Sequence, residues 1–194
     1  MKLARINTAL LVAIVLINGY VVVAPFWPRL VFWWQDRSPS HPTSTVQLQK
    51  RLQAPTSKPD IPADNRLLVP VMHLDEPIIE GSNEHALMQG PWRRPRSSTP
   101  DQASNTVIAG HRFTYTNPRG TFYFLDKVKV GDDIGIFWHG KKYVYIVREV
   151  KTVGPTDMAI EAATPGPTLT LYTCTPLWAP HNRLVVVARL ESHD

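Results

Sequence analysis

The sequence predicts an all-β domain behind a single N-terminal membrane helix, and three features support this prediction. An uncharged apolar run covers residues 8–24, a few positions after two basic residues. From residue 66 onward, short apolar runs alternate with turn residues, a pattern typical of strands. The segment between them is rich in Pro, Ser, Thr and Gln and has no sustained apolar period. The predicted organisation is an anchor over residues 1–34, a stalk over 35–64 and a β-domain over 65–194.

The composition indicates one globular domain with a tail. The chain has 194 residues, of which 43% are hydrophobic, and a formal net charge of +5. Such a chain is long and apolar enough to bury a core of ordinary size. The basic residues are scattered and form no RNA- or DNA-binding signature, so we expect no nucleic-acid partner.

The N-terminal run is close to the length of a membrane span. At 1.5 Å per residue, residues 8–24 reach about 26 Å, slightly less than a hydrocarbon core of ~30 Å. Extension through "PFWPRLVFWW" makes up the difference, and Trp27, Trp33 and Trp34 suit the aromatic belt at a membrane interface.

Charge predicts the orientation of this helix. Lys2 and Arg5 precede the apolar run, which favours a cytoplasmic N-terminus and an extracellular remainder. A cleaved signal peptide is the alternative, but Pro25 directly follows the "VVA" that would form the cleavage site. We therefore expect an uncleaved single-pass anchor in the cell membrane.

The β-domain is predicted from a series of short apolar runs. Its clearest hairpin is "IFWHGKKYVYIV", with His139 and Gly140 at the turn, and "NEHALMQG" is at most one or two helical turns. The spacing favours a barrel or a sandwich. The remaining runs are "RLLVPVM", "EPIIEG", "NTVIAGH", "DDIGIFWHG", "KKYVYIVREV", "LTLYTC" and "RLVVVARL".

The only cysteine, Cys174, ends the run "TLTLYTC". A single cysteine outside the cytoplasm is an intermolecular disulfide partner, a small buried hydrophobe or a reactive thiol. Strand alternation places Cys174 with Thr170 and Tyr172 on one face, at a strand end where catalytic groups tend to lie. A reactive thiol needs a neighbouring imidazole or guanidinium, because only a few per cent is thiolate at neutral pH.

Two residues are candidates for the imidazole and the guanidinium that would activate the thiol. His111 ends "NTVIAGH" directly after Gly110, where the missing side chain lets a backbone or a substrate approach closely. Arg183 opens "RLVVVARL" nine positions after Cys174. Each residue alone is more typical of a hydrogen-bonded or solvated surface group. Only the combination of both residues with Cys174 indicates a catalytic site.

The fragments "NTVIAGHR", "TFYFLDKVKVGDDI" and "TLTLYTC" with a following arginine resemble the sortase family over about residues 66–190. The resemblance implies a closed β-barrel of about eight strands with short helices. It also implies cysteine transpeptidase chemistry with His111, Cys174 and Arg183 as catalytic residues and Thr173 as support for the oxyanion. "GHRFTY" and "LTLYTCTPLW" are most similar to classes D and E. The lid of pilus-building members is not evident, nor is the calcium site of some class A members, although Asp157 and Glu161 are near its region.

The resemblance implies a substrate and partners, and no cofactor or metal. Cys174 would attack an L-P-x-T-G or L-A-x-T-G sorting signal of a secreted protein, and a surface amine would take the acyl group. Two alternatives remain: a thiol peptidase that releases surface proteins, and a non-catalytic protein that binds sorting signals or forms a surface scaffold. An L,D-transpeptidase has Ser-x-Gly-Cys at its nucleophile, which "LYTCTP" does not match.

Overall fold

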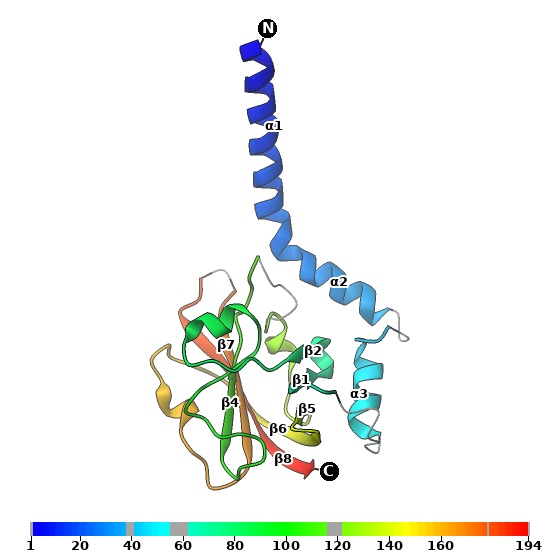
Figure 1. Cartoon of the computed structure of the whole chain (residues 1–194), viewed down its shortest axis with the longest axis vertical. Coiled ribbons are helices and arrows are strands. Elements are labelled where there is room, and N and C mark those ends of the chain that lie inside the picture. Colours follow the sequence, from blue (N-terminus) through cyan, green and yellow to red (C-terminus); the bar gives the residue numbers. More distant parts are fainter. Residues whose placement is uncertain (1, 38–40, 55–61, 116–121, 178, 194) are drawn as a thin grey trace.

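The computed structural model describes residues 2–37, 41–54, 62–115, 122–177 and 179–193. A long N-terminal helix projects from one end of a curled β-sheet, a shorter helix continues from its base, and a third helix lies beside the sheet (Figure 1). The C-terminus lies at the opposite end from the projecting helix (Figure 1).

The N-terminal helix α1 (Lys2–Val23) is followed by the short helix η1 (Ala24–Phe26) and by α2 (Trp27–Asp36). The 22 residues of α1 reach about 33 Å, so α1 alone matches a bilayer core without the extension expected from the sequence. Pro25 and Pro28 separate the helices, because proline lacks an N–H group and is tolerated only in a first helical turn. Residues 5–36 are long and apolar enough to cross a membrane, with a mean hydropathy of 2.4 over the most apolar window.

The sheet contains eight strands in the order β2-β1-β5-β6-β8-β7-β4-β3. All neighbours are antiparallel except β4 and β7, which are parallel. The all-β prediction and the expected number of strands are therefore confirmed. The strands are β1 (Arg66–Val69), β2 (Leu74–Pro77), β3 (Trp92–Arg93), β4 (Asn105–Ala109), β5 (Asp133–Trp138), β6 (Lys141–Val153), β7 (Thr168–Thr175) and β8 (Asn182–His193).

The expected closure of the barrel is wrong: the sheet is a curled half-barrel with two edges, β2 and β3. Among the described residues, the only strand pairing between these edges is a single parallel bridge between Ile79 and Trp92. The local sequence explains why no ladder forms there. β2 ends at Pro77, and the two-residue β3 lies between Pro91 and Pro95, none of which has an N–H group to donate.

The predicted hairpin is confirmed. Asp133–Trp138 and Lys141–Val153 pair from Trp138 opposite Lys141, and His139 and Gly140 form the turn. Both turn residues have positive φ, 48° and 74°, as a type I′ turn requires. The segment "NEHALMQG" contains one short 3₁₀ helix, η4 (Glu84–Met88), as expected.

Both faces of the sheet are covered. The larger apolar cluster packs on one face and includes Leu169 and Leu171 of β7. A second cluster on the opposite face includes Tyr172 and Val185, and it packs under η4 and η6 (Met158–Glu161) through Ala86 and Ile160. Because both faces of the sheet are covered, side chains on both sides of β7 are buried along almost its whole length.

The segment expected to be a stalk is partly packed. Helix α3 (Thr45–Gln53) lies on the sheet and buries Leu48 and Leu52 against Leu68 and Phe137. A side chain at Gly135 would come within 2.2 Å of Leu52, so this glycine makes room for the helix. This helix was not predicted from the sequence, because its buried apolar stripe, Leu48 and Leu52, is only about one turn long. Residues 38–40 and 55–61 of the expected stalk lie outside the described residues.

Candidate active site

Three adjacent strands, β4, β7 and β8, bring the predicted site residues to one end of the sheet. Cys174 of β7 lies directly opposite Arg183 of β8 in the antiparallel ladder. On the other side of β7, the parallel register pairs Ala109 with Tyr172, and the N–H of Gly110 donates to the carbonyl of Tyr172 at 3.1 Å. His111 is two positions beyond Ala109, just as Cys174 is two positions beyond Tyr172, so both residues lie at the same end of the sheet.

Strand alternation puts these three side chains on one face. Cys174 shares the face of Tyr172, and Arg183 shares the face of Val185. His111 follows Val107 and Ala109 at alternate positions, and both belong to the same cluster as Tyr172. Cys174 and Arg183 thus lie at one level on adjacent strands, on the face opposite the larger core, and His111, two residues beyond the end of β4, completes the row at the same end of the sheet.

Cys174 is exposed and forms no disulfide. The reading of this residue as a small buried hydrophobe is therefore wrong. Leu171 and Thr173, on either side of Tyr172 in β7, are fully buried, so exposure begins at the end of this strand. The thiol can meet a molecule from solvent without any rearrangement of the core.

His111 is held through its backbone. Its carbonyl accepts a hydrogen bond of 2.8 Å from the N–H of Phe122, while Gly110 packs against the ring of Phe122. A Cβ at Gly110 would lie 2.7 Å from that ring, so a larger residue would displace His111. The imidazole is half-buried, and this burial lowers its pKa below 6.5 because removal from water disfavours the charged form.

Arg183 has an aromatic support. Its guanidinium carbon lies 5.2 Å from the centre of the Tyr172 ring, within the range of a cation–π contact. Its buried Nη1 has no hydrogen-bond partner among the described residues. Because arginine carries five N–H donors, this leaves donor capacity beside Cys174 for a bound oxygen.

Behind Arg183, a polar chain continues from Tyr172. The Tyr172 hydroxyl donates to Glu161 at 2.6 Å, and Glu161 forms an ion pair of 3.0 Å with Arg94. Burial is the main cause that raises the pKa of Tyr172, and the hydrogen bond to Glu161 raises this pKa further, so the phenol stays protonated. Tyr172 and Arg94 were not predicted as site residues from the sequence, although the alternation that singled out Cys174 also places Tyr172 on its face.

Thr173 is not brought into this row. It is 1% exposed, and it alternates with Cys174, so its side chain points to the opposite face of β7. Its hydroxyl has no hydrogen-bond partner in the described part of the chain. This position does not support the expected role of its hydroxyl at the oxyanion.

The acidic residues considered for calcium have other partners. Glu161 contacts Tyr172 and Arg94, and Asp157 accepts a hydrogen bond from the N–H of Ala159 at the start of η6. Within the described ranges, no three His, Cys, Asp or Glu residues are grouped so that they could hold a metal ion.

A comparison with protein families identifies this architecture. The model of the sortase domain matches residues 67–191, which include β1 to β8 almost completely. This chain belongs to the sortase family. The family resemblance seen in the sequence is therefore confirmed, and sortases are cysteine transpeptidases.

Individual sortases are similar to this one in sequence and in structure. Sortase SrtE1 of Streptomyces coelicolor is 29% identical over 140 residues, which cover 64% of this chain and 39% of that relative. The structure of sortase C1 of Streptococcus agalactiae has a TM-score of 0.61 and 30% identity, covering 66% of both chains. A sortase D5 transpeptidase of Clostridium perfringens has a TM-score of 0.59 and 25% identity, covering 77% of this sortase and 89% of that chain. Since these names span three classes, the class D or E resemblance stays a prediction.

Proposed function

We propose that this chain is a membrane-anchored transpeptidase that cleaves a sorting signal of L-P-x-T-G or L-A-x-T-G type. The enzyme then transfers the acyl group to a surface amine. The proposal is supported by one end of the sheet, where an exposed thiol lies opposite a guanidinium and a half-buried imidazole follows the neighbouring strand β4. These are the groups that a thiol nucleophile needs: a base, and a donor for the oxyanion.

The first half-reaction forms a thioester. The Cys174 thiol passes its proton to the neutral imidazole of His111, and the sulfur attacks the scissile carbonyl carbon. The C–N bond then breaks, and the His111 imidazolium returns the proton to the leaving amine. A lowered pKa suits this sequence, because His111 is then ready to accept a proton at neutral pH.

The second half-reaction reverses these roles. An acceptor amine attacks the thioester carbonyl and loses a proton to His111, the C–S bond breaks, and the sulfur recovers the proton. In both tetrahedral intermediates the negative oxygen needs preorganised donors. Arg183 is the proposed donor, because its planar guanidinium can give two parallel hydrogen bonds and the ring of Tyr172 supports it.

The proposed location follows from the N-terminal helix. Residues 1–34 would form the cytoplasmic end and the anchor, and residues 65–194 the extracellular catalytic domain, joined by residues 35–64. Lys2 and Arg5 precede the apolar run, which supports this orientation. The partners would be secreted proteins with a C-terminal sorting signal and a cell-wall peptide or pilin lysine that supplies the amine.

Peptide turnover tests the proposal against its alternatives. The detergent-solubilised full chain is incubated with labelled L-P-x-T-G and L-A-x-T-G peptides, with and without candidate amines. We expect an amide product that requires both the amine and Cys174. Cleavage to a free acid whether or not an amine is present would favour the releasing peptidase, and binding without cleavage would favour the non-catalytic protein.

A further inference from the structure

One side of α2 is bound to the catalytic domain. The ring of Phe32 stacks on His73 at 4.1 Å and contacts Phe124 at 4.5 Å. The side chain of Gln35 bonds the His73 ring at 3.2 Å. Just before α2, the carbonyl of buried Pro25 accepts a hydrogen bond of 2.9 Å from the Tyr123 hydroxyl. Helix α2, which follows α1, is therefore packed on the folded domain and is not a free tether.

The other side of α2 is apolar and exposed. We define the aromatic face of α2 as Trp27, Leu30, Trp33 and Trp34, whose exposed fractions lie between 55% and 58%. Soluble proteins rarely expose such a continuous apolar surface, whereas tryptophan is enriched at membrane interfaces. Arg29 of α2 and Arg37 at its C-cap are also exposed, and such charges favour anionic lipid headgroups.

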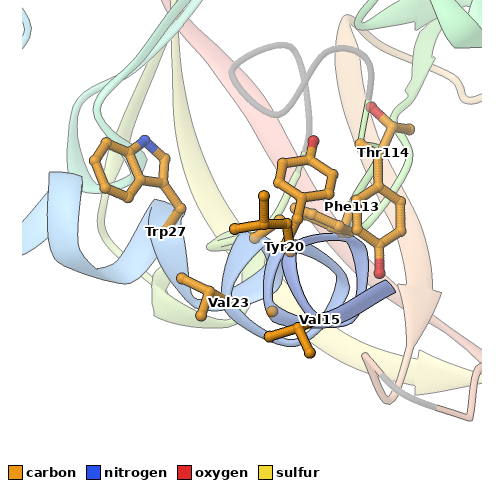
Figure 2. Close-up of a pocket in the computed structure, with 10 residues that line it drawn as sticks. Val15, Tyr20, Val23, Trp27, Phe113 and Thr114 are labelled. Atoms are coloured by element: carbon orange, nitrogen blue, oxygen red, sulfur yellow. The ribbon is translucent and has the colours of Figure 1, made fainter. Parts of the chain in front are cut away.

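A second surface adjoins this face. The loop 113–115, which begins two residues after His111, lies against the C-terminal half of α1 (Figure 2). The ring centres of Tyr20 and Tyr115 are 6.2 Å apart, and those of Phe113 and Tyr115 are 5.0 Å apart. Loop and helix enclose an apolar pocket of about 670 Å³. Its lining residues are Val15, Leu16, Gly19, Tyr20, Val23, Ala24, Trp27, Phe113, Thr114 and Tyr115.

The position of this pocket along α1 sets its depth. Val15 and Leu16 lie about 11–12 Å from the C-terminal end of α1 at 1.5 Å per residue. If α1 spans the bilayer with that end outside, a depth of this size falls within the outer half of a ~30 Å hydrocarbon core. The loop that lines the same pocket then reaches the interfacial zone of the outer leaflet.

We propose that loop 113–115 and the aromatic face of α2 together bind the lipid surface, and that an acyl chain of a membrane lipid occupies the pocket. The proposal rests on the membrane anchoring proposed above. It goes further in placing the end of the sheet that carries His111, Cys174 and Arg183 against the bilayer. In Figure 1, α1 leaves the domain on that side, while β8 runs away from Arg183 to the C-terminus at the far end.

The occupant follows from the pocket's surroundings. Apart from Thr114, two tyrosine hydroxyls and the indole N–H of Trp27, its lining has no polar side-chain group. The pocket is also continuous with an apolar helix whose side chains from Ile6 to Val23 are largely exposed. A lipid chain matches both properties, whereas a peptide would bring backbone polar groups that this lining could not satisfy.

Single-cysteine labelling tests the proposal in the intact chain. In a Cys174→Ala background, Tyr115→Cys, Leu16→Cys and Lys141→Cys are labelled with an environment-sensitive fluorophore. The proteins are reconstituted into phosphatidylcholine–phosphatidylglycerol vesicles with brominated acyl chains. Leu16 reports on the anchor. Lys141, exposed at the β5–β6 turn and thus at the far end of the sheet from Arg183, is the aqueous control.

We expect brominated lipid to reduce the fluorescence at Tyr115 by a loss comparable with that at Leu16, and aqueous iodide to quench only Lys141. Quenching at Leu16 together with iodide access at Tyr115 would overturn the proposal while leaving the anchor intact. Protection of Tyr115 from both quenchers would indicate that a second protein copy covers the loop, which also overturns it. If Leu16 is not quenched by lipid, the anchoring itself fails.

Discussion

Cys174 and Arg183 are direct cross-strand partners at the end of the β7–β8 ladder. Both strands are paired on their other sides as well, β7 with β4 and β8 with β6, so neither can shift alone. Cross-strand partners have Cβ atoms roughly 5 Å apart, which lets the long arginine side chain reach past the thiol to a bound carbonyl. This rigid pairing makes the geometry of the guanidinium, and not only its charge, the property to test.

Arg183→Lys separates geometry from charge. Lysine keeps the positive charge but has no planar fork for two parallel hydrogen bonds. We expect turnover of the sorting peptide to fall on the order of 10²-fold, nearly as far as in Arg183→Ala. Steady-state kinetics and thiol alkylation are measured in parallel, and alkylation should change little.

Arg189→Lys is the matched control, since Arg189 is exposed on the same strand. It should leave kcat unchanged. Near-normal turnover by Arg183→Lys would show that charge alone suffices. Near-normal turnover by Arg183→Ala would show that the oxyanion donor lies elsewhere.

Tyr172→Phe tests the support behind Arg183. Phenylalanine keeps the ring beneath the guanidinium but loses the 2.6 Å bond to Glu161. A hydrogen bond to a charged group is worth about 1.5–3 kcal/mol, so a loss of stability in this range is expected. A positioning role also predicts a lower kcat with little change in KM.

A double variant distinguishes positioning from general destabilisation. If Tyr172 acts through Arg183, Tyr172→Phe should reduce kcat in the native background but not in Arg183→Ala. Equal reductions in both backgrounds would mean that Tyr172 has no special link to this arginine.

The pKa of His111 predicts how the enzyme responds to acid. Burial lowers this pKa below 6.5, so His111 stays neutral until the pH falls through the lowered value. The acid limb of kcat/KM should therefore lie below 6.5, because protonated His111 cannot accept the thiol proton. NMR titration of the imidazole, assigned with His111→Gln, measures the same pKa directly.

The same shift affects stability. Unfolded His111 binds a proton more readily than folded His111, so the free energy of unfolding falls as the pH decreases from 6.5 through the lowered pKa. His73, whose pKa burial also lowers, contributes in the same direction. A titration midpoint above 6.5 for His111 would contradict both the burial and the proposed base.

Helix α3 contributes to the stability of the domain. Leu52 is 3% exposed and packs on Leu68 and Phe137, so Leu52→Ala should cost about 2–5 kcal/mol in chemical denaturation. Val46, 57% exposed on the same helix, supplies the control, and Val46→Ala should change stability by no more than about 0.5 kcal/mol. Equal effects would mean that α3 does not pack as described.

The strand pattern could be predicted because each strand of the sheet carries its own local signal. Turn residues such as His139 and Gly140 and the alternation in "TLTLYTC" are local properties of the chain. The openness of the sheet could not be predicted in this way. It depends on whether two edges that are distant in sequence, at Pro77 and Trp92, have backbone N–H donors that can pair. Helix α3 was not predicted for a similar reason, because its burial depends on the space that Gly135 leaves on the distant strand β5.

The candidate site shows the same division. Cys174, His111 and Arg183 were named from their strand ends and the family resemblance, and the register brings the three strands together. Thr173 was expected in the same site, but alternation turns its side chain to the other face. The packing of η6 on the sheet brings Glu161 to Tyr172, and Arg94, far from Cys174 in sequence, reaches Glu161 because β3 pairs with β4.

The most direct test of the central claim is mass spectrometry of the full chain mixed with a sorting peptide in the absence of an amine. A covalent thioester on Cys174 should accumulate and disappear when an amine is added, because the acyl group then moves to the acceptor. Cys174→Ala should fold normally, since this side chain is exposed, and should form no adduct. Peptide turnover that persists in Cys174→Ala would contradict the account.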